Sequence, residues 1–95
     1  MSILNFSYAE IKDAEQFQKY VSAAATLMEQ HEVEVIVRGE YVKAMQGAEK
    51  APHITAVFRY PNMDAARAFY ESREYQAIVP LRDEACIMSI HFYKE

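Results

Sequence analysis

The arginines are the residues of this sequence whose type and placement best fit a binding role. The chain has a net charge of −4 at pH 7, yet all of its arginines fall between positions 38 and 82. A guanidinium group is a planar array of donors that matches a carboxylate or a phosphate. The clustering therefore predicts a site for a small anionic molecule. The five residues are Arg38, Arg59, Arg67, Arg73 and Arg82.

Surface ion pairs are the alternative explanation for two of these arginines. Arg67 has Glu71 and Glu74 as nearby partners in the sequence, and Arg73 has Glu71. Exposed pairs of this kind contribute little to stability. Arg73 also lies beside an expected helix start, where its charge opposes the helix dipole, so we expect it to be solvated.

Tyr70 and Tyr75 flank an expected break between two helices and are candidate ligand-binding residues. A tyrosine hydroxyl can donate a hydrogen bond to an oxyanion or, at a suitable pKa, act as an acid. Its ring can equally anchor a helix to a sheet while the hydroxyl reaches water. The sequence leaves both roles open.

The histidines are scattered and do not form a metal-binding pattern. His31, His53 and His91 include no pair at helical spacing and have no cysteine beside them, so we expect no metal site and no cofactor. His53 follows a proline at the start of an expected strand, which makes it the best candidate for a general base. Cys86 has no neighbour that would lower its pKa, and we expect no catalytic thiol.

Apolar periodicity predicts the elements that position these side chains. The stripe of a helix runs from Ala14 to Gln30, and Asp13, Asn62 and Ser72 are expected N-caps. Pro80 is expected to tighten or end the last helix. The expected order is a strand over residues 4–9, the helix over 14–30, a strand over 33–37 that Arg38-Gly39-Glu40 bends, an arm over 41–45 that Gly47 closes, a strand over 54–60, a helix after Asn62, a short helix after Ser72 and a strand over 86–93.

This order predicts an α+β domain over residues 1–95 with the ferredoxin-like β-α-β-β-α-β arrangement. Such a domain has a four-stranded antiparallel sheet with its helices on one face. With 95 residues the chain is near the lower end of what folds alone, so burial through oligomerisation would help.

The second and third expected strands are apolar on both faces. A sheet with one wet face should alternate between apolar and polar residues. We therefore expect a second subunit's sheet to cover the open face and form a homodimer, with Val35, Val37 and Phe58 buried in it. The alternative is a monomer with a partly apolar surface.

The ordered set of motifs resembles the family known as domain of unknown function 1330, within the dimeric α/β-barrel superfamily. The resemblance covers nearly the whole chain and implies a ferredoxin-like fold and a dimeric α/β barrel. Arg38 and Arg82, which lie in these motifs, are the arginines expected to bind a ligand. The motifs are Arg38-Gly39, Pro61, Ala65-Ala66-Arg67, Tyr70, Ser72, Glu74-Tyr75-Gln76 and Leu81-Arg82.

The sequence departs from this family's usual pattern at three positions. Glu40 replaces a second glycine, Arg59 replaces an acidic residue, and Arg73 replaces a proline. The change at Arg59 is expected to place a cation near the cavity, where the family usually has a carboxylate.

Two functions from different classes remain open. The first is a module that binds a small anionic or aromatic metabolite between sheet and helices. The second is a cofactor-independent enzyme of the oxygenase, isomerase or decarboxylase type, which rests on analogy of fold. The acidic charge argues against nucleic acid, no apolar run is long enough to span a membrane, and the lone Cys86 without a signal peptide favours the cytoplasm.

Overall fold

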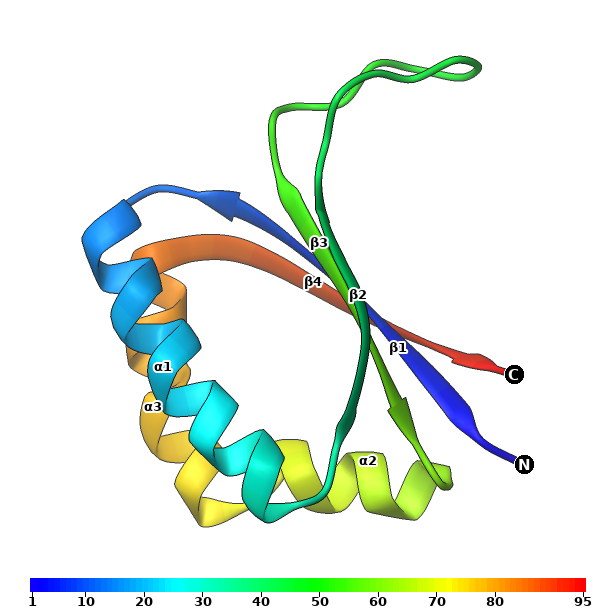
Figure 1. Cartoon of the computed structure of the whole chain (residues 1–95). Coiled ribbons are helices and arrows are strands. Elements are labelled where there is room, and N and C mark those ends of the chain that lie inside the picture. Colours follow the sequence, from blue (N-terminus) through cyan, green and yellow to red (C-terminus); the bar gives the residue numbers. More distant parts are fainter.

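Four strands form one antiparallel sheet in the order β2-β3-β1-β4, and three helices lie against one of its faces (Figure 1). The computed structural model describes residues 1–95. The ferredoxin-like arrangement is confirmed, with two consecutive helices, α2 and α3, in place of the second helix. The elements are β1 (Ile3–Ile11), α1 (Ala14–Gln30), β2 (Glu34–Glu40), β3 (Ile54–Tyr60), α2 (Met63–Tyr70), α3 (Arg73–Ala85) and β4 (Cys86–Lys94).

Each helix begins directly after the residue that the sequence predicts as its N-cap. The side chain of Asp13 accepts a hydrogen bond from the backbone N–H of Gln16 at 3.1 Å. Asn62 caps α2 in the same way through the N–H of Ala65, at 2.8 Å. These bonds satisfy backbone donors that have no partner within the helix.

Of the two effects expected of Pro80, tightening or ending the last helix, the second is wrong. Helix α3 contains Pro80 and continues to Ala85. Proline lacks the N–H that would bond to the carbonyl one turn earlier, but the rest of the helix is held by packing. Tyr75 before the proline and Ala85 after it are both buried.

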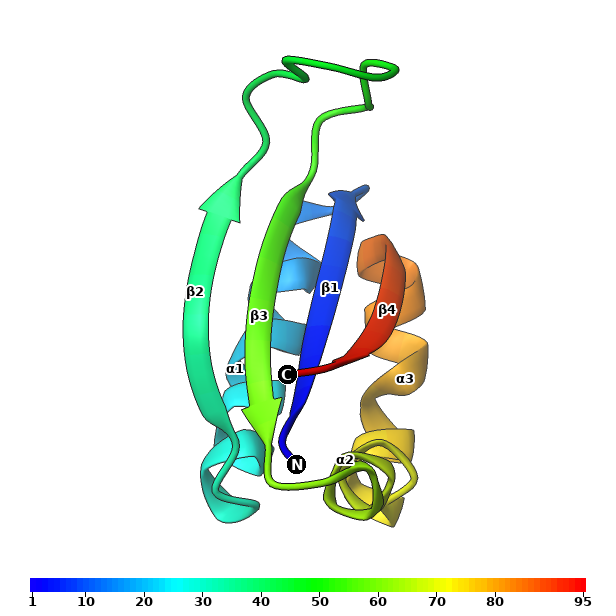
Figure 2. The ribbon, with the colours of Figure 1, turned by 90° about the vertical axis from the view of Figure 1, so that its right-hand side faces the viewer.

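The second strand also runs further than expected. Arg38 pairs with Ala56 and Glu40 with Ile54, so the segment expected to bend away stays in the sheet. The irregularity lies earlier, where the register shifts between Val35 and Val37. The arm therefore starts after β2, and it projects well beyond the sheet (Figure 2).

The face of the sheet under the helices holds the core, and Phe58 belongs to it. Phe58 is buried within the single chain, so its predicted burial is confirmed but does not depend on a second subunit. Its neighbour on β1, Asn5, is also buried on this face, together with Ser7. A polar pair in the core requires hydrogen-bond partners.

No helix covers the other face of the sheet, which is turned toward the viewer in Figure 2. Phe6 and Tyr93 pack edge to face on it, with ring centroids 5.1 Å apart. Val57 lies on this face between Phe6 and Val37, and Val37 is 53% exposed. An apolar surface thus remains open in the single chain.

None of the helices combines the length and the apolar character needed to cross a membrane.

Candidate ligand-binding cavity

A cavity of about 420 Å³ lies between α1 and the helix-facing side of the sheet. Its residues come from α1, the three strands β1, β2 and β3, and single positions of α2 and β4. Twelve of the 17 residues that line it are hydrophobic, which makes its walls largely apolar. Typical wall residues are Phe17, Val21 and Ala24 of α1 and Ile54, Ala56 and Phe58 of β3.

Arg38 is the only charged residue on the cavity wall. It extends from β2 opposite Ala56 and is exposed to solvent, so it lies where the cavity opens. No aspartate or glutamate lines the cavity to neutralise it. A guanidinium in such surroundings attracts an anion.

A polar chain crosses the cavity floor and ends at the Tyr70 hydroxyl. The Ser7 hydroxyl donates to the Asn5 Oδ1 at 3.0 Å, and the Asn5 Nδ2 donates to the Tyr70 hydroxyl. Ser7 and Tyr70 line the cavity, while Asn5 is fully buried behind them. Burial raises the pKa of Tyr70 above its usual value, so its hydroxyl is neutral at physiological pH.

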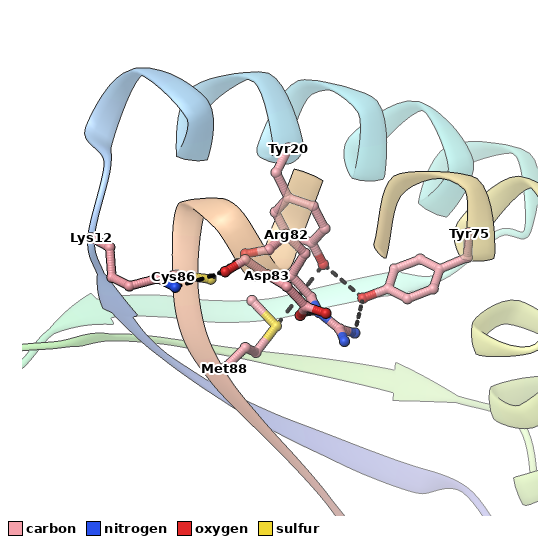
Figure 3. A network of polar contacts seen from close by, with 7 residues as sticks. All are labelled: Lys12, Tyr20, Tyr75, Arg82, Asp83, Cys86 and Met88. Atoms are coloured by element: carbon pink, nitrogen blue, oxygen red, sulfur yellow. Dashed lines mark hydrogen bonds and ion pairs between the residues drawn. The ribbon is translucent and has the colours of Figure 1, made fainter. Parts of the chain in front are cut away.

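A second network joins Tyr20 of α1 to Tyr75 and Arg82 of α3 (Figure 3). The two tyrosine hydroxyls lie 2.8 Å apart, and the Arg82 Nη1 donates to the Tyr75 hydroxyl at 3.1 Å. Of the three residues, only Tyr20 lines the cavity. The predicted site residues Tyr75 and Arg82 therefore lie outside the cavity. Tyr75 is hydrogen-bonded to the wall residue Tyr20, and Arg82 is hydrogen-bonded to Tyr75.

The Arg82 side chain is held from two sides. Its Nε donates to the Asp83 Oδ1 at 3.1 Å, and the guanidinium carbon lies 5.9 Å from the centre of the Tyr75 ring. Burial alone would lower the pKa of Arg82, but the hydrogen bonds to Tyr75 and Asp83 outweigh it and the net shift is upward. Arg82 is therefore a fixed positive charge next to the buried tyrosines.

His53 lies apart from the other predicted site residues. It lines a smaller hollow of about 190 Å³ at the base of the arm, together with Glu40 and Tyr41. Its ring stacks on Tyr41 with centroids 4.7 Å apart, and its Nδ1 lies 2.8 Å from the Ala51 carbonyl oxygen. The structure thus brings Arg38 and Tyr70 into one cavity and leaves His53 outside it.

The expectation that Arg59 lies near the cavity is wrong. It occupies the open face of the sheet, opposite Leu4, and pairs with Glu34 and Glu95. Two of its nitrogens bind the Glu95 carboxylate, at 2.7 and 2.6 Å.

The surface pairs expected for Arg67 and Arg73 are also absent. Every ion pair of the chain involves Arg59 or Arg82. Both arginines are exposed, as solvated side chains are.

Three residues that shape the site were not singled out from the sequence. Tyr20 belongs to the buried stripe of α1, where it reads as an ordinary core position. Asn5 and Ser7 alternate with Leu4 and Phe6, and the alternation alone does not show which of the two sets faces the core. The sequence feature that could have revealed the site is the polar pair Asn5 and Ser7, because polar residues on the inward face of a strand indicate a polar site.

No group of three or more histidine, cysteine, aspartate or glutamate side chains could hold a metal ion.

Solved structures share this fold at low sequence identity. A protein of unknown function from Rhodopseudomonas palustris superposes with a TM-score of 0.87 at 15% identity, over 99% of this chain and 82% of that one. SnoaB, a cofactor-independent oxygenase from Streptomyces nogalater, gives 0.73 at 7% identity, over 99% and 92%. A conserved protein from Methanosarcina mazei gives 0.65 at 19% identity, over 100% and 93%. At such identities the likeness establishes the fold alone.

Sequence comparison identifies the family. Among curated protein sequences, none matches this chain. The family model described as "Domain of unknown function (DUF1330)" matches residues 4–94, which is nearly the whole length. The chain therefore belongs to the DUF1330 family, as its motifs indicated.

Proposed function

We propose that this protein binds a small, largely apolar anion, such as an aromatic carboxylate, in the cavity between α1 and the sheet. The observation that carries the proposal is an apolar cavity of about 420 Å³ with Arg38 as its single charged wall residue. Sites for small molecules have this volume and this combination of apolar walls with a few polar groups. The apolar walls bind the body of the ligand, and Arg38 binds its acidic group.

The titratable groups of the cavity favour binding over catalysis. Besides Arg38, these are Tyr20 and Tyr70, and burial raises the pKa of both tyrosines. Both are therefore neutral donors at physiological pH and neither acts as a base. His53, the predicted general base, lines the other hollow.

Calorimetry with three compounds tests the proposal. Benzoate has both an apolar ring and a charge, benzamide has only the ring, and acetate has only the charge. We expect benzoate to bind most tightly. Because an ion-paired hydrogen bond contributes about 1.5–3 kcal/mol, Arg38→Gln should weaken benzoate binding roughly tenfold or more and leave benzamide unchanged.

Arg67→Gln is the matched control, since Arg67 is exposed on α2 and does not line the cavity. It should bind benzoate as the wild type does. Equal affinity of the wild type for benzoate and benzamide would contradict the proposed function.

A cofactor-independent oxygenase is the second candidate function. It is supported by the shared fold with SnoaB and by the neutral donors Tyr20 and Tyr70, which would stabilise an anion that forms in a bound substrate. Oxygen uptake on electron-rich phenols, measured without added metal or cofactor, tests it. Uptake no faster than in buffer would eliminate this candidate.

We also propose that two copies of the chain pair through their open sheet faces. This is supported by the open face of the sheet, which no helix covers and on which Val37 is 53% and Tyr93 51% exposed. The buried Cys86, which forms no disulfide, is consistent with a reducing compartment, and we propose the cytoplasm.

A further inference from the structure

We propose that Arg82, although it lies outside the cavity, selects the ligand by acting through Tyr75 and Tyr20 on the cavity wall. The ligand class is an apolar compound with an acidic oxygen, such as a phenol or an enol, bound as its anion with that oxygen at the Tyr20 hydroxyl. The inference rests on the proposed ligand binding and adds a second recognition point, on the α3 side of the cavity.

The direction of the hydrogen bonds carries the argument. An arginine side chain has donors and no acceptor, so the contact of 3.1 Å between the Arg82 Nη1 and the Tyr75 oxygen fixes Tyr75 as the acceptor. The Tyr75 proton is then free to donate to the Tyr20 oxygen, 2.8 Å away. The Tyr20 proton is left over and points toward the remaining neighbour.

That neighbour is a weak acceptor. The Tyr20 oxygen lies 4.0 Å from the sulfur of Met88, which also lines the cavity. A thioether accepts hydrogen bonds poorly. A ligand oxygen in the cavity would therefore be the better partner for the Tyr20 proton.

The opposite direction of donation is unfavourable. If Tyr20 donated to Tyr75, the Tyr75 oxygen would accept two bonds and its own proton would need another acceptor. The Tyr75 hydroxyl has no such acceptor, because it forms hydrogen bonds with Arg82 and Tyr20 alone. Tyr75 is 1% exposed, so water cannot take that proton, and a buried donor without a partner is costly.

The hydrogen-bond relay from Arg82 through Tyr75 to Tyr20 is strengthened by its buried surroundings. Tyr20 and Tyr75 are buried, and charge-assisted hydrogen bonds are stronger than neutral ones in such an environment. Arg82 shares its charge with Asp83, but Asp83 binds the Nε and lies at the surface, whereas the Nη1 faces Tyr75. The hydrogen bonds thus run from the positive charge of Arg82 through Tyr75 to Tyr20 on the cavity wall.

Tyr70 supplies a second hydroxyl on the same cavity. Its oxygen accepts from the Asn5 Nδ2, so its proton is also not used in that bond. The rings of Tyr70 and Tyr75 pack edge to face with centroids 4.9 Å apart, which holds the two networks next to each other. Neutral donors that surround an oxygen stabilise its anionic form.

The test uses 4-nitrophenol, which is yellow only when ionised, and 4-nitrotoluene, which has the same shape and no acidic oxygen. In wild-type protein we expect bound 4-nitrophenol to be more ionised than the free compound at the same pH. We expect its anion to bind about tenfold more tightly than 4-nitrotoluene. Arg73→Met, an exposed arginine on the same helix, is the control and should behave as wild type.

In an Arg38→Gln background, which removes the other anion-binding group of the cavity, Tyr20→Phe and Arg82→Met should each remove most of the remaining preference for the anion and leave the affinity for 4-nitrotoluene within about twofold. Because both act on one relay, the double variant should lose no more than either single variant. Tyr20→Phe retains the Arg82 charge, so it tests the relay even if Arg82→Met fails to fold.

The outcomes separate this inference from the proposed function. If 4-nitrotoluene binds but the variants keep the preference for the anion, or lose it additively, Arg82 does not act through the tyrosines and the inference fails alone. If neither compound binds the wild type, the proposed cavity function fails with it.

Discussion

The hydroxyl of Tyr60 is the one buried side-chain polar atom that has no hydrogen-bond partner. The residue is 2% exposed, and burial raises the pKa of its hydroxyl. A buried donor without a partner costs roughly 1–3 kcal/mol, so its removal relieves a penalty. We expect Tyr60→Phe to leave the free energy of unfolding unchanged or to raise it by about 1 kcal/mol, as measured by urea denaturation.

Tyr70→Phe is the matched comparison, because it removes a hydroxyl that does have a partner. It leaves the Asn5 Nδ2 buried without its acceptor. The free energy of unfolding should fall by about 1–3 kcal/mol. If Tyr60→Phe destabilised the protein as much as Tyr70→Phe, the Tyr60 hydroxyl would have to be satisfied in solution.

At the scale of single residues, the sequence located part of the site. Arg38 and Tyr70 were singled out by residue type and motif, and both line the cavity. Arg82 was singled out too, but its contact with the cavity passes through Tyr20, a residue indistinguishable from core in its helix. The hydrogen bond between Tyr20 and Tyr75 depends on how α1 packs against α3. These helices are far apart in the sequence, so local sequence patterns do not reveal the contact.

Among the elements, the junction between α2 and α3 matters most for the site, and Ser72 holds it. Its hydroxyl donates to the Phe69 carbonyl at 2.7 Å and accepts from the Tyr75 N–H at 3.1 Å. Ser72→Ala removes both bonds and should lower the free energy of unfolding by about 1–2 kcal/mol. Because Tyr75 belongs to the relay, this variant should also weaken 4-nitrophenol binding.

Asp13→Ala is the control for that prediction. It removes the N-cap of α1 and should cost about 1 kcal/mol of stability, but the hydrogen bond that is lost does not involve Tyr20, Tyr75 or Arg82. Binding of 4-nitrophenol should therefore be unchanged. A loss of binding in both variants would show that general destabilisation, and not the position of Tyr75, is responsible.

The ion pairs of Arg59 with Glu34 and Glu95 join β3 to β2 and to the residue that follows β4, and they predict an acid-sensitive contribution to stability. Hydrogen bonds from Arg59 lower the pKa of Glu95 from its ordinary value of 4.5 to about 2. A carboxylate whose pKa is lower in the folded state than in the unfolded state stabilises the protein at pH values above the unfolded pKa. This stabilisation is lost as the pH falls through the folded pKa. The stability difference between wild type and Arg59→Met should be constant above about pH 4.5 and shrink toward pH 2.

Lys12→Met is a suitable control, since the Lys12 Nζ binds the Asp83 carbonyl oxygen and no carboxylate. Its stability difference from the wild type should not depend on pH in this range. A difference for Arg59→Met that stayed constant down to pH 2 would mean that the pair with Glu95 does not form in solution.

Element boundaries were predictable where their cause is local. Asp13, Asn62 and Ser72 each cap a helix through a bond to a residue three positions later, so sequence spacing reveals them. The helix does not end at Pro80, which was one of the two expected effects, because packing on both sides of Pro80 outweighs its missing N–H. The end of β2 was misjudged because its pairing with β3 is a long-range interaction.

At the scale of the whole molecule, the single chain has a small core for its length. Only 15 of the 95 residues are buried, and every residue of β2 is exposed. A domain of this size gains stability from burying further surface. The two apolar faces of the strands led us to predict that a second subunit buries further surface. They did not reveal that Phe58 already lies in the chain's own core.

The homodimer is therefore the last prediction, and Val37 is the residue that tests it. It lies on the open face, pairs with Val57 and is 53% exposed, so an arginine there costs a monomer little, within about 0.5 kcal/mol. In a dimer formed through this face, Val37→Arg would bury an unpaired charge and break the interface. Val42→Arg is the control, because Val42 is 90% exposed on the arm. By light scattering, wild type and control should show twice the chain mass of 11.0 kDa, and Val37→Arg the mass of one chain. A wild type that scatters as a single chain at micromolar concentration would remove the proposed dimer.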